Sequence, residues 1–189
     1  MKRILCIGDS NTFGYDPRSW FGGRYPADVR WTGLLERHGC QVVNWGQNGL
    51  SIPREYDFPL LKNLIRSKLP ADAVTIMLGS NDLLNGTKAE EAARRMERLL
   101  LAIREAGADR ILLIAPPVMQ PGTWVQGDAV VRESALLAER YRALADRLET
   151  DFANAGDWDI SISYDGVHFL PEGHAAFARK LLEKLAEPQ

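Results

Sequence analysis

The sequence predicts an α/β protein built on a parallel β-sheet with helices on both of its faces. Short apolar runs alternate along the chain with stretches in which apolar residues recur every three or four positions, which is the spacing of helices that pack against a sheet. Each apolar run is followed at once by glycine, proline or asparagine, as expected of strands that end in turns. A length of 189 residues favours one compact domain over residues 1–189.

Five strands are expected. Four of them are mainly apolar, as strands buried on both faces are, and they cover residues 2–7, 41–45, 73–78 and 110–115. A fifth strand is expected near residues 150–155, although aspartate and asparagine are poor strand formers.

Helical spacing fills the intervals between the strands, and we expect its apolar stripes to be core. The stripes comprise Trp31, Leu34, Leu35 and His38; Leu60, Leu61, Leu64 and Ile65; Ala92, Met96, Leu99, Leu100 and Ile103; Leu136, Leu137, Tyr141, Leu144 and Leu148; and Ala178, Leu181, Leu182 and Leu185. The last helix is expected to open at Pro171, because proline fits the first helical turn. Residues 14–30 and 116–130 fit neither a helix nor a strand.

The composition is that of an ordinary globular protein, with 46% hydrophobic residues, 25% charged residues and a formal net charge of -2. These values exclude a disordered chain, and the small net charge gives no bulk attraction to nucleic acid or to anionic membranes. No apolar run reaches the roughly 20 residues that span a bilayer, and the run before Gly8 is too short for a signal peptide. We therefore expect a cytoplasmic protein without nucleic-acid or membrane partners, and both a monomer and a homo-oligomer remain open.

Cysteine and histidine usage indicates neither a disulfide scaffold nor a metal site. Cys6 and Cys40 are too few for such a scaffold, and we expect both to be reduced, with Cys6 in a buried strand. The three histidines lack the paired His or Cys spacing of metal ligands. The expected protein holds no metal and no cofactor.

Small polar residues follow three of the expected strands. Residues 8–11 read Gly-Asp-Ser-Asn, residues 44–49 read Asn-Trp-Gly-Gln-Asn-Gly, and residues 79–82 read Gly-Ser-Asn-Asp. Ligands of an open parallel sheet bind outside the carboxyl ends of its strands. We therefore expect the functional site there.

Near the end of the chain Asp165 stands three residues before His168, and Gly166 lets the loop curl so that the carboxylate reaches the imidazole. A serine hydroxyl is a weak nucleophile until a base takes its proton, and a histidine is a good base when a carboxylate fixes its tautomer. Ser10, His168 and Asp165 are therefore a candidate catalytic triad.

Attack on an acyl carbon also needs hydrogen-bond donors aimed at the oxyanion that develops. The backbone N–H groups of Ser10 and Gly49 and the side-chain amide of Asn81 are suitable donors. Asp9 and Asp82 are expected to brace the turns beside them.

The three polar blocks and the Asp165–His168 pair, in this order and over nearly the whole chain, resemble the four motifs of the SGNH hydrolases, also called the GDSL esterase and lipase family. The resemblance implies that Ser10 is the nucleophile, that Gly49 and Asn81 belong to the oxyanion hole, and that Asp165 and His168 complete the triad. It also implies a three-layer, flavodoxin-like sandwich whose five-stranded sheet has the order 2-1-3-4-5. That order would place the ends of strands two, one and three side by side.

Three segments are similar to the family branch that contains bacterial arylesterases and acyl-transferring esterases: KRILCIGDSNTFGY, ADVRWTGLLE and VTIMLGSND. Asn11 departs from the pattern, because it stands where the family name has leucine. It holds no catalytic role in the family, and we expect no consequence from the exchange.

Each motif alone has a plainer interpretation as a turn or a helix start, and the conjunction of the four favours catalysis. We expect a serine carboxylester hydrolase that forms an acyl-enzyme on Ser10 and acts on short acyl groups carried by aryl, alkyl or sugar alcohols. A flavodoxin-like module that binds phosphate or another small molecule is disfavoured, because no glycine-rich phosphate loop is present. A catalytically silent, carbohydrate-binding relative is disfavoured by the intact set of site residues.

Aromatic residues of the two irregular stretches are candidate walls of a substrate pocket, and they are equally suited to simple packing. The candidates are Trp20, Phe21, Tyr25 and Trp124. His174 is expected to pack in the last helix.

Overall fold

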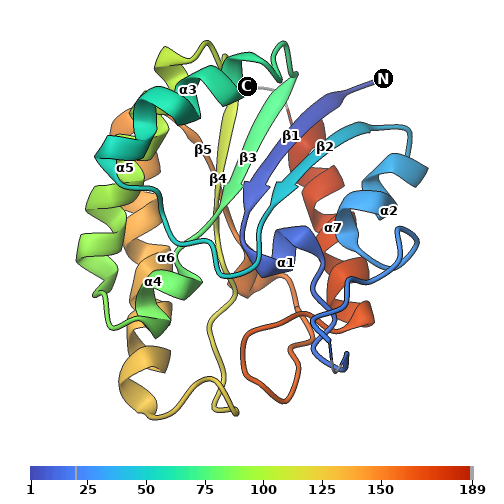
Figure 1. Cartoon of the computed structure of the whole chain (residues 1–189), viewed down its shortest axis with the longest axis vertical. Helices are drawn as coiled ribbons and strands as arrows, with labels where there is room; N and C mark the ends of the chain where they lie inside the picture. The colour runs from blue at the N-terminus through green and yellow to red at the C-terminus, as the bar shows by residue number, and fades with distance from the viewer. Residues whose placement is uncertain (20, 188–189) are drawn as a thin grey trace.

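A parallel five-stranded sheet with the order β2-β1-β3-β4-β5 runs through the middle of the molecule (Figure 1). The computed structural model describes residues 1–19 and 21–187. The strands are β1 (Arg3–Gly8), β2 (Gln41–Gly46), β3 (Ala73–Met77), β4 (Ile111–Ala115) and β5 (Asp151–Asn154). Both the parallel sheet and its order are as predicted, including the strand expected near residues 150–155.

Helices cover both faces of the sheet, so the fold has three layers (Figure 1). One face carries α3 (Phe58–Arg66), α4 (Ser80–Leu84), α5 (Ala89–Glu105) and α6 (Asp128–Leu148). The other face carries α2 (Trp31–Arg37) and α7 (Pro171–Ala186), while the single turn of α1 (Ser10–Phe13) lies at the end of β1. Short 3-10 turns cover Glu55–Asp57 and Ala155–Asp157.

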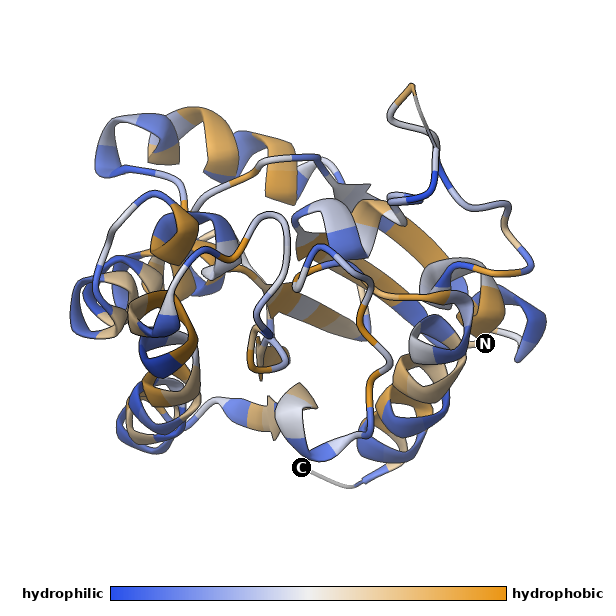
Figure 2. Cartoon of the chain, turned by 90° about the horizontal axis from the view of Figure 1, so that it is seen from below, coloured by the Kyte–Doolittle hydropathy of each residue, from blue (hydrophilic) through white to orange (hydrophobic). Residues whose placement is uncertain are grey.

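The core has two parts, one on each face of the sheet. Leu5 and Ile7 of β1 point to the side of α3, α5 and α6, whereas Ile4 and Cys6 point to the side of α2 and α7, because successive strand residues alternate between faces. Figure 2 shows the molecule from the end where the strands terminate, and the apolar strands lie between the surrounding helices. The thiols of Cys6 and Cys40 are free, as expected.

The stripe predicted as core in α3 is only partly so. Leu61 and Ile65 are buried, but Leu60 is 66% exposed and Leu64 is 39% exposed. The prediction was wrong for these two leucines because they line an open apolar hollow together with Leu50 instead of packing in the core. Leu136 of α6 is likewise exposed.

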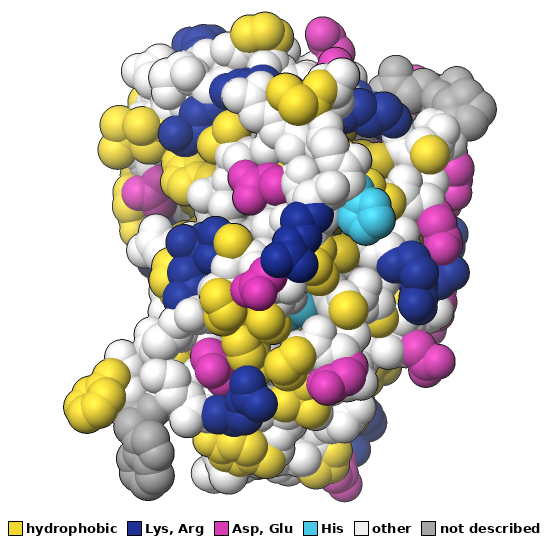
Figure 3. Space-filling model, turned by 90° about the vertical axis from the view of Figure 1, so that its right-hand side faces the viewer, with side chains coloured by type: hydrophobic (Ala, Val, Ile, Leu, Met, Phe, Trp, Pro, Cys, Tyr) yellow, Lys and Arg dark blue, Asp and Glu magenta, His cyan; other side chains and the backbone are white. Residues whose placement is uncertain are grey.

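The side of the molecule formed by α2 and α7 has no strongly charged patch among the described residues (Figure 3). Figure 3 shows acidic and basic side chains interspersed there. Within residues 1–19 and 21–187, every helix is too short or too polar to cross a membrane.

Candidate active site

The ends of β2, β1 and β3 lie side by side, which brings the three polar blocks together. Gly8 at the end of β1 pairs with Gly46 of β2 on one side and with Met77 of β3 on the other. The loop after β2 is tied to β1 by a hydrogen bond from Gln47 N–H to the Gly8 carbonyl (3.0 Å). Residues 10, 49 and 81 each follow within four positions of these paired strand ends.

Ser10 begins helix α1, and the preceding residue holds that helix in place. The carboxylate of Asp9 caps α1 by accepting from Asn11 N–H at 3.0 Å. The helix lies so close to β2 that a Cβ added to Gly46 would stand 2.2 Å from Phe13 N. Glycine is therefore required there, and Ser10 is fixed against the end of the sheet.

Ser10, His168 and Asp165 form a continuous chain of hydrogen bonds. Ser10 Oγ lies 2.9 Å from His168 Nε2, and His168 Nδ1 lies 2.8 Å from Asp165 Oδ2. With the proton on Nδ1, the imidazole donates to the carboxylate and accepts from the hydroxyl. The hydroxyl group of a nearly buried serine therefore faces an oriented base.

The carboxylate of Asp165 stays ionised in this setting. Burial on its own would raise the pKa of Asp165, but hydrogen bonds from the His168 ring and from the backbone N–H groups of His168 and Val167 outweigh it and lower the pKa below its ordinary value. Both backbone bonds, at 2.9 Å, end on Oδ1. Gly166 lies at φ +86°, the left-handed backbone that lets the loop curl back on itself.

Asp9 and His174 are buried close to Ser10 and His168 but lie outside their hydrogen-bond chain. Burial raises the pKa of Asp9 to about 6, and burial lowers the pKa of His174 to about 3. The His174 ring is fully buried, accepts weakly from Trp31 N–H and packs on Tyr25 and Phe169. It is a packing residue, as predicted.

Asn81 and Asp82 at the start of α4 hold the loop that contains Gly49. Asn81 Nδ2 donates to the Leu50 carbonyl at 3.0 Å, and Asp82 Oδ2 accepts from Ile52 N–H at 2.9 Å. Burial raises the pKa of Asp82, although Ile52 N–H and Arg95 act in the opposite direction. Asp82 therefore braces the loop after β2, whereas the sequence predicted that it would brace its own turn.

Three donors at the strand ends are free to bind an anion. Gly49 lies at φ +72° with open space around its Cα. Among the described residues, the backbone N–H groups of Ser10 and Gly49 have no protein acceptor, and one of the two N–H bonds of the Asn81 amide is directed to Leu50 while the other remains. The arrangement can stabilise negative charge beside Ser10.

The aromatic residues predicted as candidate pocket walls lie in different environments. Trp124 lies against the base, with its ring centroid 4.9 Å from that of His168, and it is half exposed. Tyr25 is buried in the core against His174, so it offers no wall to a pocket, and Phe21 is 99% exposed. Trp20 lies outside the described residues. A loop aromatic can cover a core or face solvent, and the sequence does not distinguish the two.

Tyr15 was not among the predicted site residues, yet its ring centroid lies 4.6 Å from that of His168. Sequence reasoning also dismissed Asn11, whose amide contacts the backbone on both sides of His168. The only available signal was proximity in sequence to Ser10. Nothing in a single sequence pairs these residues with a loop that lies about 150 positions away.

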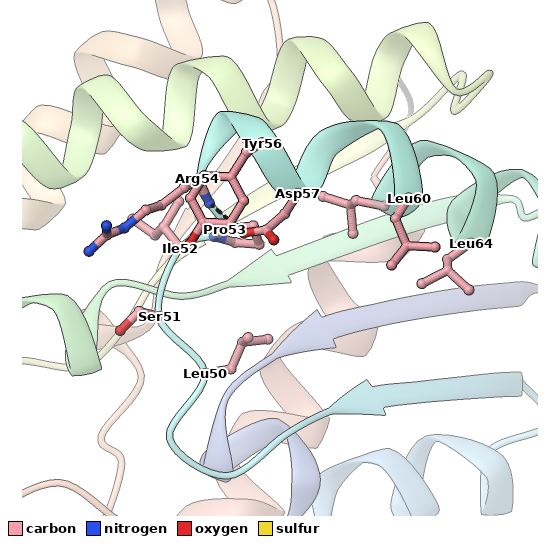
Figure 4. A pocket seen from close by; sticks show the side chains of 10 residues that line it. Leu50, Ser51, Ile52, Pro53, Arg54, Tyr56, Asp57, Leu60 and Leu64 are labelled. Carbon is pink, nitrogen blue, oxygen red and sulfur yellow. Dashed lines mark hydrogen bonds between the residues drawn. The ribbon is translucent and has the colours of Figure 1, made fainter.

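An apolar hollow of about 410 Å³ opens beside the loop that follows β2 (Figure 4). Leu50, whose carbonyl binds Asn81, lies at its edge, and Leu60 and Leu64 of α3 line the far side. The exposed leucines that were expected in the core thus border a cavity next to the loop that contains Gly49.

Comparison with known proteins agrees with this geometry. Residues 6–176 match the model of the GDSL-like lipase/acylhydrolase family. Among curated proteins, none matches the chain in sequence.

Solved structures with the same fold include several esterases. An aryl esterase from M. smegmatis is 27% identical, with 98% of each chain covered and a TM-score of 0.85. A carbohydrate acetylesterase from Sinorhizobium meliloti is 28% identical, with 98% of this chain and 99% of that chain covered and a TM-score of 0.86. An arylesterase described as putative, from Agrobacterium tumefaciens, is 31% identical, with 97% of each chain covered and a TM-score of 0.83.

The chain therefore belongs to the GDSL-like lipase/acylhydrolase family, the SGNH hydrolases. It is a carboxylic ester hydrolase.

Proposed function

We propose that this protein cleaves short-chain acyl esters through an acyl-enzyme formed on Ser10. The observation that carries the proposal is the unbroken hydrogen-bond chain from Ser10 Oγ through His168 to Asp165. A serine in this setting loses its proton to the imidazole as it attacks, and the carboxylate stabilises the imidazolium that forms.

The reaction divides into two steps. In acylation, Ser10 Oγ bonds to the acyl carbon, its proton passes to His168 Nε2, and the same proton is delivered to the alcohol oxygen as the ester bond breaks. In deacylation, His168 takes a proton from water, the hydroxide oxygen bonds to the acyl carbon, and Ser10 leaves with the proton as the acid is released. An alcohol in place of that water would give acyl transfer.

The oxyanion of each tetrahedral intermediate would be bound by the N–H groups of Ser10 and Gly49 and by the Asn81 amide. Support comes from their position at adjacent strand ends and from the lack of protein acceptors for the two backbone groups. Such donors, fixed before the reaction, stabilise charge without reorganisation.

The leaving alcohol would bind against Trp124 and Tyr15. The base must reach the alcohol oxygen to protonate it, so the leaving group lies beside His168, and these two rings are the aromatic surfaces next to it. Flat apolar surfaces of this kind suit an aryl ring or the face of a sugar. Aryl, alkyl and acetylated sugar esters with short acyl groups are therefore the proposed substrates.

A fluorophosphonate probe tests the nucleophile. The wild-type chain should take up one probe on the peptide that contains Ser10 and lose esterase activity in parallel, while a folded Ser10→Ala variant should take up none. Equal labelling of the variant would overturn the assignment. A wild-type protein that neither labels nor cleaves any ester but binds a carbohydrate would instead support a silent binding protein.

A matrix of acyl chain lengths against aryl, alkyl and sugar alcohols tests the substrate class. We expect kcat/KM to be highest for acetyl esters, and Trp124→Ala to lower it roughly tenfold for aryl acetates. Phe21→Ala serves as the control, because Phe21 is almost fully exposed and should change nothing. A uniform loss over all alcohols, or none, would remove Trp124 from the leaving-group site.

A further inference from the structure

Asn11, the residue after Ser10, forms two side-chain hydrogen bonds with the loop that carries His168. Its Oδ1 accepts from Phe169 N–H at 3.0 Å, and its Nδ2 donates to the Val167 carbonyl at 3.1 Å. One buried amide therefore binds the residues immediately before and after His168. We propose that Asn11 is a positioning residue that fixes the His168 imidazole relative to Ser10 Oγ, an inference that rests on the proposed function.

The backbone of Asn11 is itself fixed by two hydrogen bonds. Its backbone N–H donates to Asp9 Oδ1 at 3.0 Å, and its carbonyl accepts from Trp31 Nε1 at 2.9 Å. The side chain is only 4% exposed. The nucleophile and the clamp on the base therefore share one turn of helix, and any movement of Ser10 carries the His168 loop with it.

The loop that carries His168 needs the side-chain amide of Asn11 to complete its hydrogen bonding. Asp165 Oδ1 accepts from the N–H groups of Val167 and His168, and Ser163 N–H donates to the His168 carbonyl at 2.8 Å. The remaining groups are the Val167 carbonyl and Phe169 N–H, and in the described part of the chain Asn11 is their sole partner. Asp165 thus sets the ring from one side of the loop and Asn11 sets the backbone from the other.

Only a side chain with both a donor and an acceptor at this length meets the requirement. Leucine offers neither group and would leave two buried backbone groups unpaired. Aspartate keeps the acceptor for Phe169 N–H, loses the donor to Val167, and adds a negative charge near His168. Asn11, which stands where the family name has leucine, therefore links the helix that carries Ser10 to the loop that carries Asp165 and His168.

The test compares Asn11→Leu and Asn11→Asp with Thr12→Val. The control changes a neighbouring buried side chain of the same helix whose hydroxyl has no hydrogen-bond partner. We expect kcat to fall about 10- to 100-fold in Asn11→Leu and less in Asn11→Asp, since small displacements of a catalytic group carry losses of this size. KM should change little, because the amide contacts no substrate, and Thr12→Val should match wild type.

Two readouts separate positioning from simple stabilisation. The pH profile of kcat/KM should differ from wild type in Asn11→Asp, because the variant places a carboxyl group against the loop that carries His168. The downfield proton resonance of the His168 Nδ1–H, assigned by its loss in His168→Gln, should broaden or shift in both Asn11 variants. This resonance is measured without any substrate, so it still decides the inference if the proposed ester chemistry fails.

Folded Asn11 variants with wild-type kcat, an unmoved pH profile and an unchanged resonance would overturn the inference, whatever their Tm. If Asn11→Leu does not fold, Asn11→Asp carries the same comparison. Failure of the proposed function is distinct, because it would appear as a wild-type protein that reacts with neither esters nor fluorophosphonates.

Discussion

One N–H of the Asn81 side-chain amide holds the loop after β2, and the other is the donor that we propose for the oxyanion. One N–H donates to the Leu50 carbonyl at 3.0 Å, while the neighbouring Asp82 holds Ile52 N–H. The loop with Gly49 is therefore anchored twice, and a substitution at either anchor perturbs it. Of these two anchors, only Asn81 also has an N–H group that could bind the proposed oxyanion, so its two roles can be separated.

Asn81→Ala should lower kcat about 100- to 1000-fold, the usual effect of removing one oxyanion donor, with little change in KM or in the pH profile. Asp82→Ala is the matched control, because it releases the same loop at Ile52 and removes no donor. We expect it to lower Tm with a much smaller loss of kcat. Measured per folded molecule, an undiminished kcat in Asn81→Ala would show that the residue only holds the loop.

The proximity of the candidate site residues could be predicted because each lies in a block of small polar residues at a strand end or beside a glycine. Ser10, Asn81 and the Asp165–His168 pair are examples, and the physical rule about parallel strand ends brings the blocks together. Asn11 and Tyr15 could not be found this way. Their contacts with the His168 loop depend on packing across the fold, and Tyr25 shows the reverse error of a loop aromatic that turns into the core.

At the scale of elements, the loop of residues 116–127 is joined to the triad loop along its backbone. Gln120 N–H donates to the Gly166 carbonyl at 3.0 Å, and Trp124 N–H donates to the Asp165 carbonyl at 3.1 Å. The two loops approach so closely that a Cβ on Gly166 would stand 2.0 Å from the Gln120 carbonyl oxygen. Trp124 is thus placed against His168 by the same bonds that shape the Asp165 turn.

Gly166→Ala should therefore lower both stability and kcat. The new Cβ forces the two loops apart, and the residue also keeps a positive φ, a strain on the order of 1–3 kcal/mol. Gly86→Ala isolates the second effect, because Gly86 lies at φ +84° with nothing within 4 Å of the added Cβ. Thermal unfolding and steady-state kinetics of the two variants decide the matter: equal losses of Tm with kcat intact in both would contradict the coupling of the loops.

Elements that bury a periodic face were predictable, and those defined by a single cap were not. The strands and the long helices α5, α6 and α7 follow their apolar pattern. The short helices α1 and α4 depend on local backbone, such as the Asp9 cap and Gly79 at φ +123°. For α3 the pattern predicted the helix correctly but the burial of Leu60 and Leu64 wrongly, because an apolar stripe does not reveal whether other elements cover it completely.

At the scale of the whole molecule, two buried groups oppose one another in their effect on stability with pH. Asp9 has a pKa of about 6 against an ordinary 3.8, so the folded state holds its proton longer and the free energy of unfolding falls as pH rises between these values, by up to about 3 kcal/mol. His174 has a pKa of about 3 against 6.5, so the unfolded state binds the extra proton and the free energy of unfolding rises with pH, by up to about 5 kcal/mol.

The wild-type protein should therefore show a nearly flat stability between about pH 4 and 6. Below about pH 4 stability should fall, because His174 still favours the unfolded state and the lowered pKa of Asp165 adds to its effect. His174→Phe removes the rising contribution, so its stability should decrease from pH 4 to 6, whereas Asp9→Asn should increase over the same interval. Urea unfolding at a series of pH values measures all three slopes, and parallel curves for the three proteins would refute the assignment.

The most direct test of the central claim is to find the acyl group on Ser10 during turnover. The protein is mixed rapidly with an aryl acetate, quenched in acid at early times, and mapped by peptide mass spectrometry alongside a Ser10→Ala variant. We expect a burst of the phenol product, one acetyl group on the Ser10 peptide, and neither burst nor acetylation in the variant. Acetyl found on another residue, or continued ester cleavage by Ser10→Ala at the wild-type rate, would contradict it.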